Sequence, residues 1–301
     1  MPEGHVLHRL ARDVNGAFAN RPLVISSPQG RFDTDGLQGL RLAAAQAHGK
    51  QLFLHFATPE ALAAAGVAPG QPALVAGAGN HPDTDATQAH PVEATAIVHI
   101  HLGLIGTFRL EEPLDTHGQI RLRLATPECA AHLRGPQWCR LISDVEFDTA
   151  RAKLGADPLI PGEDPTAVLT RARRSRKPVA SLLMDQALFA GVGNIYRAEV
   201  LFRHHIDPMT PGKELDEGRW REVWDDLVGL MDVGVQRGRI DTVDEEHTPE
   251  AMGRAPRKDD HGGEVYVYRR AGQPCYVCGA EIALRPFEGR NLFYCPGCQT
   301  D

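Results

Sequence analysis

The pattern of hydrophobic and polar positions divides the chain into a β-rich first half and a helical second half. Apolar residues recur at helical spacing from Val6 to Phe18, which predicts an amphipathic helix directly after the amino terminus. Strand-like alternation then covers residues 22–56, 96–104 and 119–124. The segment 57–92 is rich in Ala, Gly and Pro and is expected to be a loop or an insertion. We therefore expect residues 1–145 to form a mostly β domain with a leading helix.

The second half changes to a helical period, and we expect a helical domain at residues 155–240. Pro178 predicts the start of one helix, and Asn194 is expected to cap another. The predicted helix bodies are Ser181–Phe189, Ile195–His204 and Asp216–Val233. The polar segment 241–263 is expected to be a mobile loop, and residues 264–301 form a separate cysteine-containing domain.

Six cysteines are present, and four of them lie in two Cys-x-x-Cys pairs near the carboxyl terminus. The four residues are Cys275, Cys278, Cys295 and Cys298. Four thiolates in two close pairs suit a tetrahedral zinc ion in a closed, structural site. We therefore expect one structural Zn²⁺ that supports a small β-hairpin, with Arg290 at its tip.

The net charge of −7 does not indicate a nucleic-acid-binding protein, so any such binding must depend on a local basic cluster. One cluster precedes the predicted helix at 181–189 and consists of Arg171, Arg173, Arg174, Arg176 and Lys177. Beyond that helix, the Gly191–Asn194 turn offers backbone N–H groups that could bind a phosphate. The turn alone is more typical of a plain tight turn in which Asn194 caps the helix, but together with the cluster it predicts a clamp for the DNA backbone.

No apolar run is long enough to span a bilayer, and the first residues lack the layout of a signal peptide. We therefore expect a cytoplasmic protein without a membrane partner.

Lys50 is the only lysine among the first 150 residues and opens a predicted strand. Leu104 lies in a glycine-bounded bend, where it is either a core residue or an exposed wedge that fills the gap left by a displaced base.

Pro2 and Glu3 precede the first predicted helix, and proline and acidic residues are common at such a position. A second interpretation is chemical. If Met1 is removed, the ring nitrogen of Pro2 becomes a secondary amine, and the positive end of the helix dipole lowers its pKa from an ordinary value of about 8. Such an amine is a potential nucleophile at neutral pH.

The motifs, taken in order, resemble those of the Fpg/Nei DNA glycosylases, most closely the endonuclease VIII branch of actinobacterial type. The matching stretches cover nearly the whole chain and are Met1–His5, His48–Lys50, His101–Leu104, Leu183–Tyr196 and Gly289–Gln299. The resemblance implies an α+β multidomain fold. Its parts are a β-sandwich with a leading helix, a helix-two-turn-helix domain and a C-terminal zinc-finger β-hairpin, with double-stranded DNA held in the cleft between domains.

The resemblance also implies roles for individual residues. Pro2 resembles the nucleophile, and Glu3 resembles the acid that helps to open the deoxyribose ring. Lys50 resembles the lysine that contacts phosphate beside the lesion and assists elimination. Asn194, beside Gly193, resembles a phosphate anchor, and Arg290 resembles the arginine of the zinc finger that grips the same backbone.

Two departures from the family concern the substrate. Family members that act on oxidised purines begin Pro-Glu-Leu, whereas this chain begins Pro-Glu-Gly. Those members also carry an Arg and a Phe in a loop that fills the gap left by the displaced base. The comparable loop here is Ala125–Ala131, which contains neither an Arg nor a Phe. The wedge methionine common in that branch is Leu104 here. The Pro-Glu-Gly start favours oxidised pyrimidines and abasic sites.

The sequence therefore predicts a monomeric, nucleoid-associated enzyme of base excision repair. It would be a DNA glycosylase and AP lyase that acts through an imine of Pro2 and nicks DNA by β,δ-elimination. Two alternatives remain at this point: an AP lyase with little base excision, and a damaged-DNA-binding protein without catalysis.

Overall fold

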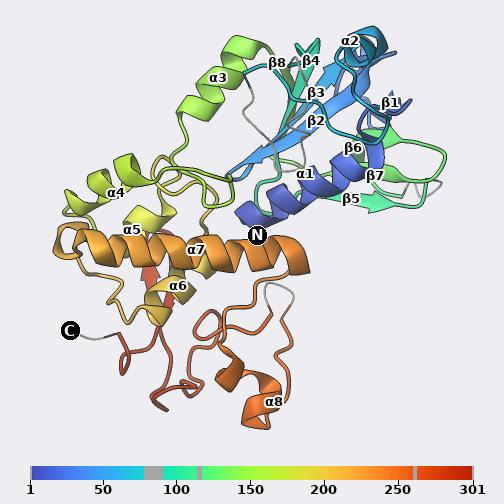
Figure 1. Ribbon diagram of the computed structural model, residues 1–301. Helices are drawn as coiled ribbons and strands as arrows, with labels where there is room; N and C mark the ends of the chain where they lie inside the picture. Colours follow the sequence, from blue (N-terminus) through green and yellow to red (C-terminus); the bar gives the residue numbers. More distant parts are fainter. Residues whose placement is uncertain (1, 78–90, 114–116, 260–262, 300–301) are drawn as a thin grey trace. The chain divides into compact units, whose positions relative to one another are not determined.

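The computed structural model describes residues 2–77, 91–113, 117–259 and 263–299. Its contacts divide the chain into two compact units (Figure 1). The first contains residues 1–2 and 6–153, and the second contains residues 3–5 and 154–301. The further division of the second half into helical and zinc-finger domains stays a prediction. No helix among the described residues is long and apolar enough to cross a membrane.

The first unit is a β-sandwich built from two antiparallel sheets of four strands. One sheet has the strand order β2-β3-β4-β8, with β2 at Arg41–His48, β3 at Gln51–Ala57, β4 at Ala96–His101 and β8 at Trp138–Ile142. The other has the order β1-β6-β7-β5, with β1 at Val24–Ser26, β6 at Ile120–Ala125, β7 at Ala130–Arg134 and β5 at Thr107–Glu111. The expected β-sandwich is therefore confirmed.

Alternation along the strands explains why the sheets pack face to face. Leu52 and Leu54 of one sheet share a hydrophobic core with Leu122 and Leu124 of the other, because every second side chain points to the same face. Helix α1, at Gly4–Phe18, adds Leu7, Val14 and Phe18 to this core (Figure 1). The helix predicted after the amino terminus is therefore confirmed.

Short helices surround the sandwich. They are a 3₁₀ helix at Asp35–Leu37, α2 at Pro59–Ala64 and α3 at Asp144–Ala152. Helix α2 lies in the segment expected to be a loop, where the hydroxyl of Thr58 caps it and Pro59 occupies its first turn. Residues 78–90 of that segment lie outside the described residues. Two strand predictions are wrong: residues 31–32 form a bend, and Lys50 occupies the turn that joins β2 to β3.

The second unit is helical, with a terminal hairpin. Its helices are α4 at Thr166–Arg173, α5 at Val179–Met184, α6 at Asn194–Arg203, α7 at Glu217–Arg237 and α8 at Pro249–Met252, with 3₁₀ turns at Gly212–Glu214 and Glu245–His247. The hairpin pairs β9, at Ala283–Phe287, with β10, at Arg290–Tyr294. Helix α8 lies in the segment expected to be a mobile loop, of which residues 260–262 are outside the described residues.

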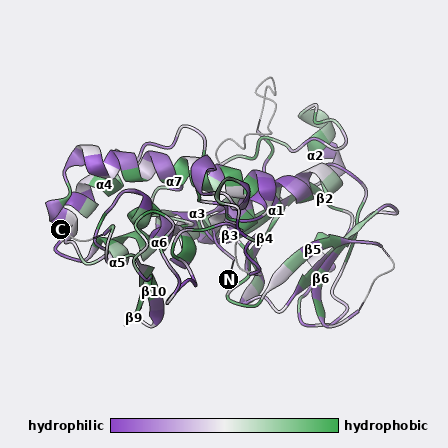
Figure 2. Ribbon diagram, turned by 90° about the horizontal axis from the view of Figure 1, so that it is seen from below, coloured by the Kyte–Doolittle hydropathy of each residue, from purple (hydrophilic) through white to green (hydrophobic). Residues whose placement is uncertain are grey.

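Helix boundaries differ from the prediction at three places. Helix α5 stops at Met184, because Asp185 is extended. Helix α6 is capped by Gly193, and Asn194 is its first helical residue. Helix α7 continues to Arg237 and ends at Gly238, whose left-handed conformation suits glycine. Helix α7 carries both hydrophilic and hydrophobic residues along its length (Figure 2), as expected for a helix with one face toward the core. Its buried residues include Trp220 and Trp224.

His55 is a buried imidazole in the first unit. Its ring packs edge-on against Phe147 of α3, and neither ring nitrogen has a hydrogen-bond partner among the described residues. Burial, and to a lesser extent the positive charge of Arg151, lowers the pKa of His55 from 6.5 to about 4. His55 is therefore neutral in the folded protein above that pH.

We predict that His55 makes the first unit sensitive to acid. Its folded pKa lies below its unfolded pKa, so its neutral form supports full stability above pH 6.5, and stability falls as the pH drops toward 4. The total loss is on the order of 3 kcal/mol. His55→Phe should reduce this loss, as measured by hydrogen exchange of β3 and β4 amides at pH 7 and pH 5. His117→Phe, at an exposed position of the same unit, is the control. Equal acid sensitivity in wild type and His55→Phe would contradict the assignment.

Candidate active site

The carboxylate of Glu3 lies at the amino terminus of α6. Glu3 is 1% exposed, and its two oxygens accept hydrogen bonds from the backbone N–H groups of Ile195, Gly193 and Tyr196 at 2.8, 3.1 and 3.4 Å. The first N–H groups of a helix have no partner within the helix, and the helix dipole favours a negative charge beside them. The backbone N–H of Gly4 also donates to Gly191 O at 2.9 Å. Glu3 is thus fixed by α6 and by the turn before it.

These contacts correct one prediction. The N–H groups at the Gly191–Asn194 turn were expected to bind a DNA phosphate, but in the structure the N–H of Gly193 donates to the Glu3 carboxylate and the N–H of Gly191 donates to the side-chain oxygen of Gln186. Glycine at position 193 has a clear reason: a Cβ there would lie 2.3 Å from the carboxylate carbon of Glu3. Gly193 therefore makes room for Glu3.

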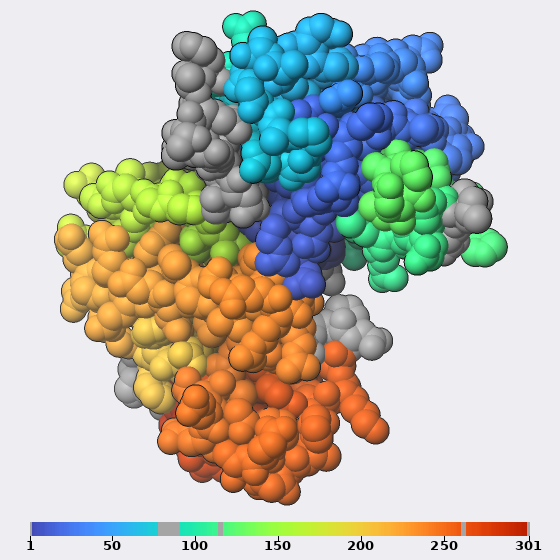
Figure 3. Space-filling view, turned by 45° about the vertical axis from the view of Figure 1, so that its right-hand side comes forward, coloured from blue at the N-terminus to red at the C-terminus, as the bar shows by residue number. Residues whose placement is uncertain are grey.

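Pro2 directly precedes this buried carboxylate and is itself half-buried. The amino-terminal stretch, dark blue in Figure 3, reaches the molecular surface. A group that attacks a macromolecular substrate must be accessible, and Pro2 is only partly buried. Met1 lies outside the described residues, and the role of Pro2 as a nucleophile stays a prediction.

Asn194 connects α6 to the terminal hairpin. Its side chain does not cap the helix, contrary to the prediction. Its Nδ2 donates to Asn291 O of β10 at 3.0 Å, and its Oδ1 accepts a hydrogen bond from Nη2 of Arg197. The amide is therefore engaged on both sides within the protein.

Arg290 opens β10 and is exposed, as predicted. The preceding turn consists of Glu288 and Gly289, both with positive φ (47° and 73°), which is the conformation of a tight two-residue hairpin turn. Ser181 Oγ donates to a carboxylate oxygen of Glu288 at 2.7 Å and ties the turn to α5. Arg290 is thus presented by a short, anchored turn.

The charges near Asn194 affect Arg197. Burial and, to a lesser extent, the nearby positive charge of Arg290 lower the pKa of Arg197 from 12.5 to about 10, although Glu3 and Glu288 act in the opposite direction. Glu3, Arg197, Glu288 and Arg290 therefore form one group of interacting charges. Arg197 was not among the predicted site residues, because nothing in the sequence pattern of α6 distinguishes it from a surface arginine.

In the first unit, His101 lies near the charge of Lys50 and bonds to the turn that carries Leu104. Burial lowers the pKa of His101, and the positive charge of Lys50 lowers it further. Nδ1 of His101 accepts a hydrogen bond from the backbone N–H of Gly103 at 3.1 Å and so closes the turn that carries Leu104. Leu104 is 67% exposed and Ile105 is 85% exposed, so neither is a core residue.

A loop of the first unit touches the turn that carries Leu104. Residues 126–129 form the turn between β6 and β7, whereas the segment that touches the Leu104 turn joins β7 to β8. In that segment the N–H of Gln137 donates to His101 O at 2.9 Å, and a Cβ on Gly103 would lie 2.9 Å from Gln137. This loop reads Gly135-Pro136-Gln137 and also lacks an Arg-Phe pair.

The basic cluster before α5 is exposed. Arg174 ends α4, and Lys177 lies in the link to α5. Arg173 forms an ion pair with Glu217 at 2.9 Å and is partly neutralised by it. Arg174 and Lys177 are therefore accessible cations of the second unit, and their contact with DNA stays a prediction.

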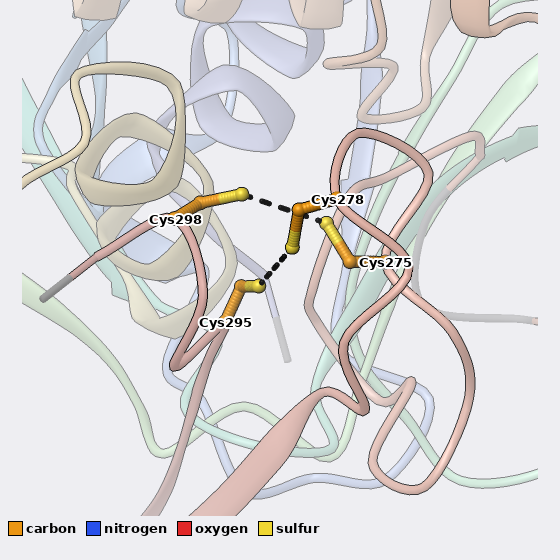
Figure 4. Close-up of side chains that lie close together, drawn as sticks. All are labelled: Cys275, Cys278, Cys295 and Cys298. Atoms are coloured by element: carbon orange, nitrogen blue, oxygen red, sulfur yellow. Dashed lines mark hydrogen bonds between the residues drawn. The ribbon is translucent and has the colours of Figure 1, made fainter.

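Cys275, Cys278, Cys295 and Cys298 lie together at the base of the hairpin (Figure 4). Their Sγ atoms all lie within 4.8 Å of one another, and two of the pairs are separated by 3.8 and 3.4 Å. Zinc–sulfur bonds of about 2.3 Å in a tetrahedron place sulfurs about 3.8 Å apart. The cluster therefore fits a metal ion with four thiolate ligands.

Part of the second unit matches a known protein family. A match to the "Formamidopyrimidine-DNA glycosylase H2TH domain" covers residues 154–245. Endonuclease 8 1 of Mycobacterium tuberculosis (strain ATCC 25618 / H37Rv) is 42% identical over the full length of both chains. The formamidopyrimidine-DNA glycosylase of Synechococcus sp. is 32% identical over 66% of this chain and 72% of its own.

Solved structures agree in fold. The Lactococcus lactis Fpg bound to abasic-site DNA has a TM-score of 0.70 at 20% identity, and the alignment covers 99% of this chain and 100% of that chain. A β-sandwich, an H2TH domain and a four-cysteine hairpin are the parts of a DNA-repair glycosylase. The chain belongs to the Fpg/Nei family of DNA glycosylases and AP lyases of base excision repair, on the endonuclease VIII side.

We predict that Gly193→Ala abolishes most AP-lyase activity. The added Cβ must displace the Glu3 carboxylate from its three donors, and misplacement of a catalytic group by about 1 Å costs roughly a hundredfold in rate. Gly229→Ala in α7, where a Cβ would meet nothing within 4 Å, is the matched control and should retain the wild-type rate. Strand cleavage at an abasic site measures both variants. A wild-type rate in Gly193→Ala would show that the position of Glu3 is unimportant.

Proposed function

We propose that the chain excises oxidised bases from DNA, with pyrimidines favoured, through an imine formed by Pro2, and then cuts the strand by β,δ-elimination. The observation that carries this proposal is the fixed position of Glu3. Three backbone donors hold its carboxylate directly beside Pro2 in the chain. An amino-terminal amine next to an immobilised carboxylate is a suitable pair for nucleophilic attack and proton transfer.

The proposed chemistry begins when removal of Met1 frees the secondary amine of Pro2. The amine attacks C1′ of the deoxyribose, the bond from C1′ to the base breaks, and the base leaves with a proton. The Glu3 carboxylate takes up the proton that the attacking amine releases and transfers it to the ring oxygen as the C1′–O4′ bond breaks, while the proton on the departing base comes from solvent. The product is a cationic iminium, which acidifies the C2′ proton, so the 3′ phosphate and then the 5′ phosphate are eliminated.

Other residues are assigned to binding. Lys50 contacts a phosphate beside the lesion, and Arg290, Asn194, Arg174 and Lys177 contact the DNA backbone. Leu104 fills the gap after the nucleotide is flipped out, and its 67% exposure supports this role. Because the Asn194 amide already binds within the protein, its contribution to DNA binding depends on its remaining N–H or on the hairpin that it holds.

The metal is assigned as one structural Zn²⁺, because four thiolates in a closed set suit zinc and leave no open position for catalysis. Double-stranded DNA with a damaged base or an abasic site is the proposed partner. The protein would act as a monomer in the cytoplasm, associated with the nucleoid.

Borohydride trapping tests the imine. Reduction during reaction with abasic DNA should yield a covalent protein–DNA adduct, because it converts the iminium into a stable amine. Pro2→Gly, or protein that retains Met1, should lose the adduct. Absence of an adduct with the processed wild-type protein would overturn the proposal. Relative yields on oxidised-pyrimidine, oxidised-purine and abasic duplexes would then separate a glycosylase from an AP lyase with little base excision.

Metal analysis tests the zinc assignment. We expect one equivalent of zinc per chain, and we expect Cys298→Ser to reduce both the zinc content and the affinity for abasic-site DNA, because the hairpin that carries Arg290 depends on the cluster. Cys129→Ser, in the first unit and outside the cluster, should change neither. Far less than one equivalent of zinc in the wild-type protein would contradict the assignment.

A further inference from the structure

Arg197 is a buried cation that contacts Asn194, one of the proposed DNA-contacting residues. It lies one helical turn after Asn194 on α6 and is 1% exposed. Its Nη2 donates to Asn194 Oδ1, and its Nε has no hydrogen-bond partner among the described residues. Burying a guanidinium is costly unless it is paired. A side chain that is kept buried with incomplete compensation requires an explanation.

Ion pairing does not supply that explanation. No salt bridge links Arg197 to a carboxylate within the described ranges, in contrast to Arg203 on the same helix, which pairs with Asp226 and Asp244 at 2.8 Å. Glu3 and Glu288 attract Arg197 only at longer range, and Arg290 repels it. The direct polar contact of Arg197 is the amide of Asn194.

This contact determines the orientation of the amide. A guanidinium can only donate, so its partner on Asn194 must be the oxygen. The amide nitrogen then points to the other side, where it donates to Asn291 O of β10 at 3.0 Å. Without Arg197, the Asn194 amide could rotate and lose its bond to the hairpin.

A second contact reaches the opposite strand of the same hairpin. The guanidinium carbon of Arg197 lies 6.0 Å from the ring centroid of Phe287, within the range of a cation–π interaction. Phe287 is the cross-strand partner of Arg290. Arg197 therefore supports both strands where Arg290 leaves the hairpin: β10 through Asn194, and β9 through Phe287.

We propose that Arg197 is a positioning residue for the DNA grip: it fixes the Asn194 amide and holds the β9–β10 turn so that Arg290 is presented to the DNA backbone. This inference rests on the proposed function, in which Arg290 contacts DNA. The four cysteines lie at the other end of the hairpin and do not alone determine where Arg290 lies. The contacts of Arg197 supply a further restraint near the turn.

A double-mutant cycle on the full zinc-loaded chain tests the proposal. Affinity for a duplex that contains a tetrahydrofuran abasic-site analogue would be measured by fluorescence anisotropy for wild type, Arg197→Met, Arg290→Ala and the double variant. Arg197→Met should weaken binding about tenfold, in the range expected for a lost charge-assisted contact. The double variant should bind no more weakly than Arg290→Ala, because both changes remove the same contact.

Two further variants separate positioning from general stability. Arg197→Lys keeps the charge and one donor, and it should recover most of the lost affinity. Arg203→Met removes an ion-paired arginine from the same helix and should lower stability while leaving affinity unchanged below its unfolding temperature.

Additive losses in the double variant, or wild-type affinity in Arg197→Met, would overturn the positioning role. Either result, together with a normal borohydride adduct in the wild-type protein, would leave the proposed function intact. Loss of the wild-type adduct would instead overturn the function itself.

Discussion

Glu3 is buried, and a buried carboxylate is stable only if hydrogen bonds replace the water that it has lost. The start of α6 supplies three N–H groups, which would themselves have lacked partners within the helix. Each group thus satisfies the other, and the chain start is fixed by residues about 190 positions away. Gly193 is part of this constraint, because any larger residue would occupy the place of the carboxylate. The position of Pro2, and with it the proposed chemistry, depends on this interaction.

The hairpin depends on two independent restraints. The four cysteines cluster at its base in an arrangement that fits a metal ion. Near its turn, Asn194 donates to Asn291 O of β10 and Ser181 donates to Glu288, while Arg197 donates to Asn194 and faces the ring of Phe287. Arg290 lies between these restraints, so loss of either would allow the guanidinium to move without changing its chemistry.

Local patterns were sufficient to predict the leading helix, the mostly β first half and the metal cluster. In each case the signal lies within a short stretch, such as the two Cys-x-x-Cys pairs. The partner of Glu3 was not predictable, because the donors are backbone N–H groups that leave no trace in side-chain identity. Asn194 was predicted to cap α6 because asparagine is common at the start of a helix. In the structure its side chain instead donates to Asn291 O of the hairpin. Arg197 was missed because burial, which gives it its role, is a property of packing.

The proposed reaction depends on a covalent bond between the amine of Pro2 and the sugar. The most direct measurement is peptide mapping of the borohydride-reduced adduct by mass spectrometry, after the intact mass has shown that Met1 is absent. The account predicts that the reduced sugar is attached to the nitrogen of Pro2, in a peptide that begins Pro2-Glu3-Gly4. Attachment to Lys50 or to any other lysine would contradict it.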